Sequence, residues 1–187
     1  MARSYGSFRP HMGGKPVKGI NEIINNLNRQ IGRIKDRTLQ GLIRVQAKIY
    51  QDMDHVPPKI PVEYGNLRKS YFVVTSKGTI YRGESPSFTD ERGFQSRLLV
   101  DHSFALLDSR LEAVRIGQTK GPCVVLGFSA WYAPYVHEMY NSKSGEPIVW
   151  SREGSGPGFW RAAIGKNWNF ALKTVAEEAR KHERARR

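Results

Sequence analysis

The sequence predicts a single α+β domain: a long N-terminal helix, a mostly antiparallel sheet of about four strands, and a C-terminal helix packed on the sheet. Three observations predict this class. Apolar residues recur at helical spacing over residues 20–53 and again over residues 159–181. Between these segments lie short β-branched and aromatic runs, separated by turns that contain glycine and proline. The length of 187 residues suits one domain with a sizeable core.

The first helix is predicted from an apolar stripe that begins at Ile20 and ends at Met53. At 1.5 Å per residue this helix would be roughly 50 Å long, which is more than a compact body of this size can cover. We therefore expect part of the stripe to meet another subunit. Gly32 and Gly41 each cost about 1 kcal/mol relative to alanine, so a kinked helical hairpin folded on its own body is the alternative. Residues 1–18 are basic, contain no acidic residue and predict an extended arm.

A proline-rich turn follows the first helix. Three prolines within residues 57–61 prevent the helix from continuing, because each lacks a backbone N–H and restricts the residue before it. Gly65 and Asn66 tolerate a positive φ and predict a sharp turn. The pattern is strand-like from Leu67 onward, so the segment joins the helix to a β-rich body.

Two strands are predicted directly after this turn. Residues 71–75 are aromatic and β-branched, and the Lys-Gly pair after them predicts a turn into a return strand at residues 79–81. Residues 82–103 are polar and rich in turn formers, which predicts a surface loop or a lid over a neighbouring subunit.

The next part of the chain contains the most apolar run. Residues 104–111 fit either a short helix or a strand, and residues 113–117 alternate in polarity. Residues 123–128 are almost entirely apolar and predict a central strand of the sheet.

The C-terminal third predicts two helices with a long loop between them. Residues 131–140 are dense in aromatic side chains, and Pro134 suits the first turn of a short helix. The face of this helix that would pack on the sheet contains Tyr132, Tyr135, Val136 and Met139. Residues 141–158 are rich in Gly, Ser and Pro and include Trp150, as in loops that are functional or disordered. Residues 159–181 predict a second long helix, with one apolar face made of Ala163, Ile164, Trp168, Leu172, Val175 and Ala179.

The formal net charge of +13 and the pI of about 10.1 indicate an anionic partner, such as nucleic acid, an anionic surface or an acidic protein. The alternative is that the charge serves solubility. The tail at residues 182–187 is densely basic. No apolar run approaches the roughly 20 residues that span a bilayer, and the N-terminus lacks the apolar core of a secretory signal, so we expect no membrane contact.

Catalytic signatures are absent from the sequence. The single cysteine, Cys123, excludes an internal disulfide and lies in an apolar run, which predicts a buried, inert thiol with a raised pKa. None of the five histidines has a metal-binding spacing, and no phosphate loop is present. Residues 101–103 read Asp-His-Ser, but triads are assembled in space and not along the chain. His137 and Glu138 are the best acid–base pair, and neighbouring residues point in different directions. We expect no enzyme, cofactor, metal or small-molecule substrate.

Three motifs resemble those of tailed-bacteriophage neck proteins, the tail-completion or head–tail joining family. Residues 61–70 read Pro-Val-Glu-Tyr-Gly-Asn-Leu-Arg-Lys-Ser and resemble a Pro-Val-Asp-Thr-Gly-Asn-Leu-Arg-x-Ser signature. Residues 127–138, from Gly-Phe-Ser-Ala-Trp-Tyr-Ala to Val-His-Glu, resemble a second signature, a glycine followed by Tyr-Ala-x-Tyr-Val-Glu. Residues 157–163 are similar to the start of the family's aromatic-capped C-terminal helix. In this chain Glu-Tyr replaces Asp-Thr, an extra histidine precedes the final glutamate, and the segment between the first two signatures is long.

The resemblance implies a virion structural protein of the neck, which completes the tail, joins it to the head connector and forms part of the DNA conduit. It implies a closed ring of copies of this chain, roughly six or twelve. The implied partners are other neck, connector and tail-tube proteins, and genomic DNA in the channel through non-specific contacts. The implied location is the virion, with the host cytoplasm during assembly. A tail terminator or head-side stopper is an alternative within the neck. A non-specific nucleic-acid-binding protein and a small hydrolase that uses His137 and Glu138 are alternatives of other classes.

The predicted interface residues fall in three groups. The group that would set the first turn and strand contains Asn66, Leu67 and Arg68. The aromatic anchor and its polar edge contain Tyr132, Tyr135 and Glu138. The C-terminal basic arm contains Arg184, Arg186 and Arg187. The alternative for three of them is an ordinary place in the core, namely for Leu67, Tyr132 and Tyr135. Aromatic side chains of the second motif could also stack on single-stranded bases.

Overall fold

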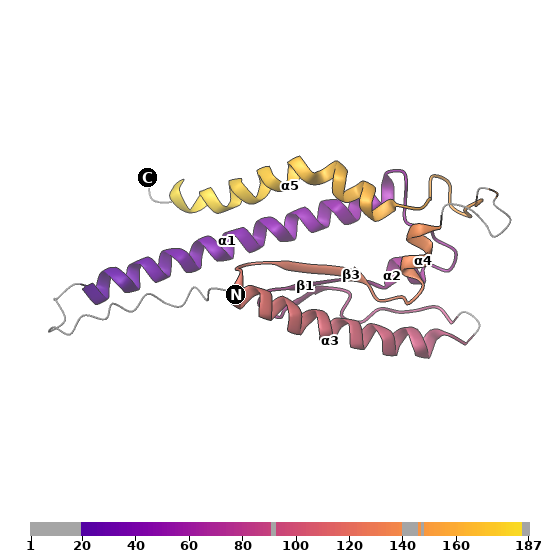
Figure 1. Ribbon diagram of the computed structural model, residues 1–187, viewed down its shortest axis with the longest axis horizontal. Helices are drawn as coiled ribbons and strands as arrows, with labels where there is room; N and C mark the ends of the chain where they lie inside the picture. Colours follow the sequence, from indigo (N-terminus) through magenta and orange to yellow (C-terminus); the bar gives the residue numbers. More distant parts are fainter. Residues whose placement is uncertain (1–19, 91–92, 140–145, 147, 185–187) are drawn as a thin grey trace.

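Four layers lie one above another in the structure, a computed structural model that describes residues 20–90, 93–139, 146 and 148–184. In Figure 1 the C-terminal helix lies over the long N-terminal helix, the sheet lies below that helix, and a third long helix covers the far face of the sheet. The predicted α+β class is confirmed. The sheet has three strands and not about four, since residues 113–117, which alternate in polarity, belong to the third helix.

The N-terminal helix, α1 (Ile20–His55), is continuous, so the kinked hairpin is wrong. Its main partner is α5 (Phe159–Arg184), which runs antiparallel beside it (Figure 1). Gly41 lies at the closest approach, where a Cβ atom would come within 3.0 Å of the Cα of Val175. The glycine therefore allows the two helices to pack closely and does not break α1.

The predicted inner face of α5 is confirmed at Ala163 and Val175, which pack in or against the main apolar cluster, and is wrong for the large side chains of Trp168 and Leu172. Trp168 and Leu172 are about 60% exposed, and the buried positions are Phe159, Ala163, Asn167 and Glu178. Two of these are polar because they bond across the helix pair. The amide of Asn167 donates to Asp52 at 2.8 Å, and the Glu178 carboxylate accepts from Arg44 and Lys181. An apolar pattern cannot find an interface that is built partly from hydrogen bonds. The helix meets the sheet at its first turn, where Phe159 contacts Phe128.

The sheet has the order β2-β1-β3, and both outer strands pair antiparallel with the central one. The strands are β1 (Tyr71–Thr75), β2 (Ile80–Arg82) and β3 (Val124–Phe128). The two strands predicted around residues 71–81 are confirmed, and Gly78 in the turn between them has a φ of 74°. The prediction of a central strand at residues 123–128 is wrong, because β3 is an edge strand. Its apolar character arises because helices cover both of its faces.

Successive side chains of β1 enter two different apolar clusters. Tyr71 and Val73 face α1, in a cluster that includes Val45, Ile49 and Met53. Phe72 and Val74 face the third helix, in a cluster that includes Leu106 and Ala113. Because both faces are covered, all five residues of β1 are buried.

The third helix, α3 (Gln95–Thr119), replaces several sequence predictions. The predicted loop at residues 82–103 is helical from Gln95, and the residues predicted as helix or strand are helix. The buried positions recur at helical spacing: Leu98, His102, Leu106 and Ala113. However, the outer face is also apolar, with Val100, Phe104, Leu107 and Leu111 all more than half exposed. Apolar residues on both faces weaken the amphipathic pattern and hide the helix.

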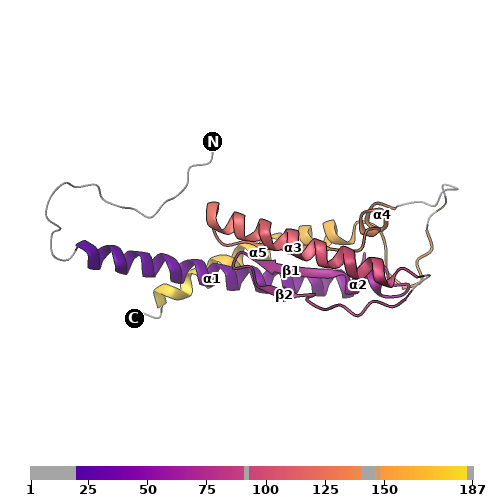
Figure 2. The ribbon, with the colours of Figure 1, turned by 90° about the horizontal axis from the view of Figure 1, so that it is seen from below.

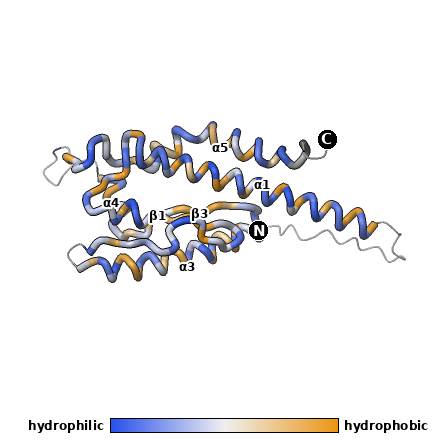
Figure 3. The backbone as a smooth tube through the Cα atoms, turned by 180° about the vertical axis from the view of Figure 1, so that it is seen from behind, coloured by the Kyte–Doolittle hydropathy of each residue, from blue (hydrophilic) through white to orange (hydrophobic). Residues whose placement is uncertain are grey.

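The N-terminal half of α1 extends past the sheet and α3, and its first turns extend past α5 as well (Figures 1 and 2). Its uncovered stripe, called here the α1 stripe, is 37–67% exposed and consists of Ile20, Ile23, Leu27, Ile31 and Ile34. Figure 3 shows hydrophobic positions continuing along this half of the helix. The prediction that α1 outruns its own body is confirmed, and its contact with another subunit stays a prediction. The predicted arm at residues 1–18 lies outside the described residues.

Candidate interaction site

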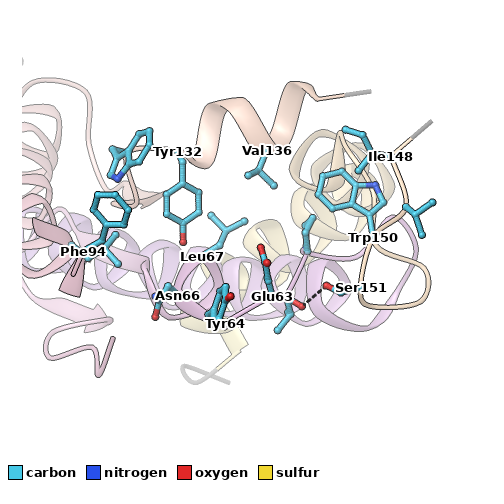
Figure 4. Close-up of a pocket in the computed structure, with 16 residues that line it drawn as sticks. Glu63, Tyr64, Asn66, Leu67, Phe94, Tyr132, Val136, Ile148, Trp150 and Ser151 are labelled. Carbon is cyan, nitrogen blue, oxygen red and sulfur yellow. Dashed lines mark hydrogen bonds between the residues drawn. The ribbon is translucent and has the colours of Figure 1, made fainter. Parts of the chain in front are cut away.

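Segments from distant parts of the sequence surround one cavity of about 450 Å³ (Figure 4). Residues 61–67 of the first motif form one wall, and residues 131, 132 and 136 of the second motif form another. Residues 148–151 close one end, and Phe94 and Leu98 close the other. The two motif segments were predicted separately from the sequence, and the fold brings them together.

The first wall is shaped by a left-handed glycine. Gly65 has a φ of 79° and precedes α2 (Asn66–Lys69), a single helical turn. The predicted turn is confirmed, but a strand beginning at Leu67 is wrong, because β1 begins only at Tyr71. Ser70 explains the helical turn, since its hydroxyl donates to the carbonyl of Leu67 at 2.7 Å.

Asn66 and Leu67 both line this wall from buried positions. The amide of Asn66 donates to the carbonyl of Thr89 at 2.9 Å, and its side-chain oxygen accepts the N–H of Thr89 at 2.8 Å. Asn66 therefore fastens the loop after β2 to the turn. Leu67 is 5% exposed and belongs to the main apolar cluster, so its alternative place in the core is confirmed. Arg68 lines a different depression and pairs with Asp54 at 3.3 Å.

The second wall is the start of α4 (Ala133–Glu138), which Pro134 opens as predicted. Tyr132 and Val136 line the cavity and pack against the main cluster. Tyr135 is 66% exposed and does not line the cavity, so neither the predicted packing face nor a place in the core holds for it. The reason is that the buried side of this short helix is centred on Ala133. Met139, at 42% exposure, is likewise outside the packed face.

The polar edge of α4 carries an exposed ion pair. Arg161 of α5 contacts the carboxylate of Glu138 at 3.1 Å. The Nε2 atom of His137 lies 3.5 Å from the same carboxylate, and its ring meets Phe159 edge-on at 5.0 Å. Burial lowers the pKa of His137, which favours its neutral form. Within the described part of the chain, no serine, threonine or cysteine side chain bonds to His137, so these residues assemble no nucleophile–base pair there.

A buried histidine outside the cavity ties α3 to the sheet. His102 is 2% exposed, and its Nε2 atom donates to the carbonyl of Gly83. Its Nδ1 atom lies 2.6 Å from the hydroxyl of Ser129, which donates to the neutral ring. Burial lowers the pKa of His102. The neighbours Asp101 and Ser103 take no part in this network, so the Asp-His-Ser run is not a catalytic unit.

The remaining walls contain residues that the sequence analysis did not select. Phe94 lies 6.5 Å from the ring of Trp131, and Arg97 stacks 4.8 Å over that ring. The hydroxyl of Ser151 donates to the carbonyl of Val62 at 3.1 Å and joins the long loop to the first wall. Trp150 of the predicted long loop also lines the cavity. The spacing of apolar residues along α3 could have placed the end wall, but the predicted loop obscured it.

The chemistry of the cavity suits an apolar or aromatic side chain. Its lining is mostly aromatic, aliphatic and proline residues, and Glu63 carries the only charge among the lining residues. Such a lining offers dispersion and hydrophobic contact with little to hold an anion. Cys123 lies elsewhere and is only partly buried, where a buried thiol was predicted. Its partial burial raises the pKa of the thiol, as predicted, and the thiol lies 3.5 Å from the carbonyl of Ala113.

Among the described residues, no group of three or more His, Cys, Asp or Glu side chains could hold a metal, and no helix is long and apolar enough to cross a membrane. Arg184 is the last residue of α5, so that helix enters the predicted tail, while Arg186 and Arg187 lie outside the described residues.

Comparisons of the chain with protein-family models, curated proteins and solved structures found no match.

Proposed function

We propose that the chain is a structural protein of the neck of a tailed phage, which completes the tail, joins it to the head connector and forms part of the DNA conduit. The resemblance of three ordered motifs supports the neck. Two of these motifs form facing walls of one cavity, as expected of segments that work together. The role in assembly is supported by one observation above the others, the extent of uncovered apolar surface.

Uncovered apolar side chains form rows on separate helices. The α1 stripe is one row. A second row on α3 contains Val100, Phe104, Leu107 and Leu111, with exposed fractions of 53–67%. Monomeric soluble proteins rarely expose such contiguous patches, and larger ones mark interaction sites. Because the rows are different surfaces of one chain, one copy can present its α1 stripe to another surface of the next. Repetition of such a heterologous contact closes a ring when the rotation permits.

In this proposal the protein acts by fit. The apolar rows hold neighbouring copies together, and the aromatic cavity takes an apolar side chain from an adjoining neck or tail protein. The net charge of +13 suits a conduit through which DNA passes, because non-specific contacts with phosphates do not depend on sequence.

The proposal is tested by locating the chain in purified virions. Gold-labelled antibody against the folded protein is expected to bind at the junction between head and tail. The proposal would be contradicted if mass spectrometry of purified virions finds none of the protein. It would also be contradicted if the label is spread along the tail shaft. Antibody against a head protein supplies the control for access.

A further inference from the structure

A second depression, of about 270 Å³, lies between α1, α2 and the end of β2, and is called here the basic pocket. Its lining includes Arg68, Lys69 and Arg82, together with the rings of Tyr50 and Tyr71. No acidic residue lines it. The aromatic cavity shows the opposite character, with one carboxylate and no cation among its lining residues.

The position of Arg82 is fixed by its neighbours. Its guanidinium lies 3.5 Å over the ring of Tyr50 and 5.8 Å from that of Tyr71. The next residue, Gly83, packs so closely that a Cβ atom would lie 2.6 Å from the carbonyl of Tyr71, and its own carbonyl accepts from His102. The stacking uses the face of the guanidinium and leaves its N–H edge available for hydrogen bonds.

The cations of the pocket exceed the acidic groups near them. Neither Arg82 nor Lys69 forms an ion pair with a carboxylate of the described residues, and the Lys69 ammonium donates to the hydroxyl of Thr89 at 3.2 Å. Asp54 pairs with Arg68, but it is shared with Arg152, which contacts it more closely, at 2.8 Å against 3.3 Å. The hydrogen bonds from Arg68 to Asp54 both use Nη1. One shared carboxylate leaves the pocket with a net positive charge.

We infer that the basic pocket binds a phosphate group of a nucleic-acid backbone. An arginine with a free N–H edge and a lysine can hold the anionic oxygens together, and charge-assisted bonds of this kind are the strong ones. The ring of Tyr71 is buried and that of Tyr50 is covered by Arg82, so the rings hold the arginine in place and the cations supply the contact with the phosphate. Nothing in the pocket reads a base edge, so the binding is independent of sequence.

This inference deepens the proposed conduit role and rests on it for the source of the phosphate. It adds a defined position at which passing DNA touches the protein. Binding can be measured on the purified chain, without a ring, so its failure is distinguishable from a failure of the neck proposal.

The experiment compares two variants that each lose one arginine and one lysine. K69Q/R82Q removes cations from the pocket, and K173Q/R180Q removes exposed cations from α5, on the far side of α1. Binding to a fluorescent 20-base-pair duplex is followed by anisotropy at several salt concentrations. Loss of one phosphate contact lowers the salt slope by about 0.9, which corresponds to roughly tenfold weaker binding at 0.1 M salt. We expect this change for K69Q/R82Q and less than about twofold for K173Q/R180Q.

A second readout uses inorganic phosphate as the probe. In NMR titrations, the backbone amides of Lys69 and Gly83 are expected to shift more than those of α5, and K69Q/R82Q is expected to lose the shifts. Thermal unfolding tests whether K69Q/R82Q is folded. If this double variant is unfolded, K69Q alone replaces it and is expected to weaken DNA binding about threefold. Equal weakening by the two double variants would overturn the inference, because only total charge would matter. Phosphate shifts without a difference on DNA would overturn nucleic acid as the source.

Discussion

The α1 stripe can be tested by placing charges on it. The proposed change is L27E/I31E, which alters two neighbours along the stripe, 54% and 42% exposed, in the half of α1 that extends beyond the sheet and α3. Neither side chain belongs to the apolar clusters of the described chain. The free energy of unfolding of the monomer is therefore expected to change by only about 0.5 kcal/mol.

The cost of this change to assembly follows from the exposed fractions. The five residues of the α1 stripe expose the equivalent of roughly two and a half aliphatic side chains. Full burial of each such side chain contributes about 1.5–3 kcal/mol, so covering the stripe contributes about 4–7 kcal/mol per contact. L27E/I31E removes about 1.5–3 kcal/mol of this and adds the desolvation of two carboxylates. We expect the dissociation constant of the contact to rise at least about 100-fold.

Sedimentation velocity over a range of concentrations measures the assembly, and circular dichroism measures the fold. The control is N25E/N26E, which adds the same charge to the turn of α1 that contains Leu27, outside the stripe. The control should assemble as the unmodified chain does. If L27E/I31E assembles normally, or if both variants fail equally, the α1 stripe is not the contact and the reasoning is refuted.

Three further predictions concern the fold. G32A should raise the free energy of unfolding by about 0.5–1 kcal/mol, since nothing lies within 4 Å of its new methyl group. G41A should lower the free energy of unfolding by about 1–3 kcal/mol, because α5 must move away from the new methyl group. Denaturant titration compares the two variants. N66A should cost about 1–3 kcal/mol, because it leaves the polar groups of Thr89 without their partner, and N25A, at an exposed position, is its control in the same titration. The pKa of His102 is lower in the folded chain than its ordinary value of 6.5. As the pH drops, the unfolded chain therefore takes up the proton before the folded chain does. The free energy of unfolding falls from about pH 6.5 down through the folded pKa. H102Q should flatten part of this fall in titrations at pH 7.5, 6.5 and 5.5, while His137 contributes in the same direction.

Each of these predictions can fail clearly. Equal effects of the two glycine substitutions would mean that the close approach of α1 and α5 at Gly41 is wrong. Equal stability of N66A and N25A would mean that the hydrogen bonds to Thr89 contribute nothing net. An H102Q variant with the full pH dependence would show that another group carries the fall.

The sequence predicted best where one physical cause acts alone. The amphipathic stripe gave α1 at nearly the observed bounds, the β-branched run gave β1, and Pro134 marked the first turn of α4. Gly65 marked a turn because only glycine adopts its left-handed conformation without strain. These signals are local, so they survive without knowledge of the rest of the fold.

The wrong predictions concern helix faces whose burial is determined by tertiary contacts. On α5, Asn167 is buried because Asp52 of α1 accepts its hydrogen bond, while Trp168 is exposed. On α3, apolar residues on the outer face concealed the helical period and led to a predicted loop. Both errors concern faces whose partners cannot be read from the local sequence. We propose that the exposed apolar rows on α1 and α3 contact partners outside the chain.

The candidate site was predicted in part. Asn66, Leu67 and Tyr132 line the aromatic cavity, whereas Tyr135 points elsewhere and Arg68 lines the basic pocket. The meeting of the two motifs depends on how α4 and α2 pack at one end of the sheet. That arrangement involves residues about 65 positions apart and has no local signal.

The most direct test of the central claim is electron microscopy of a lysate from a phage in which this gene has been deleted. DNA-filled heads beside separate tails of finished length are the predicted result, and expression of the unmodified chain should restore joined particles. Overlong or ragged tails would move the chain to tail termination, and empty heads with leaked DNA would move it to the head-side stopper. Normal, infectious particles would contradict the neck function.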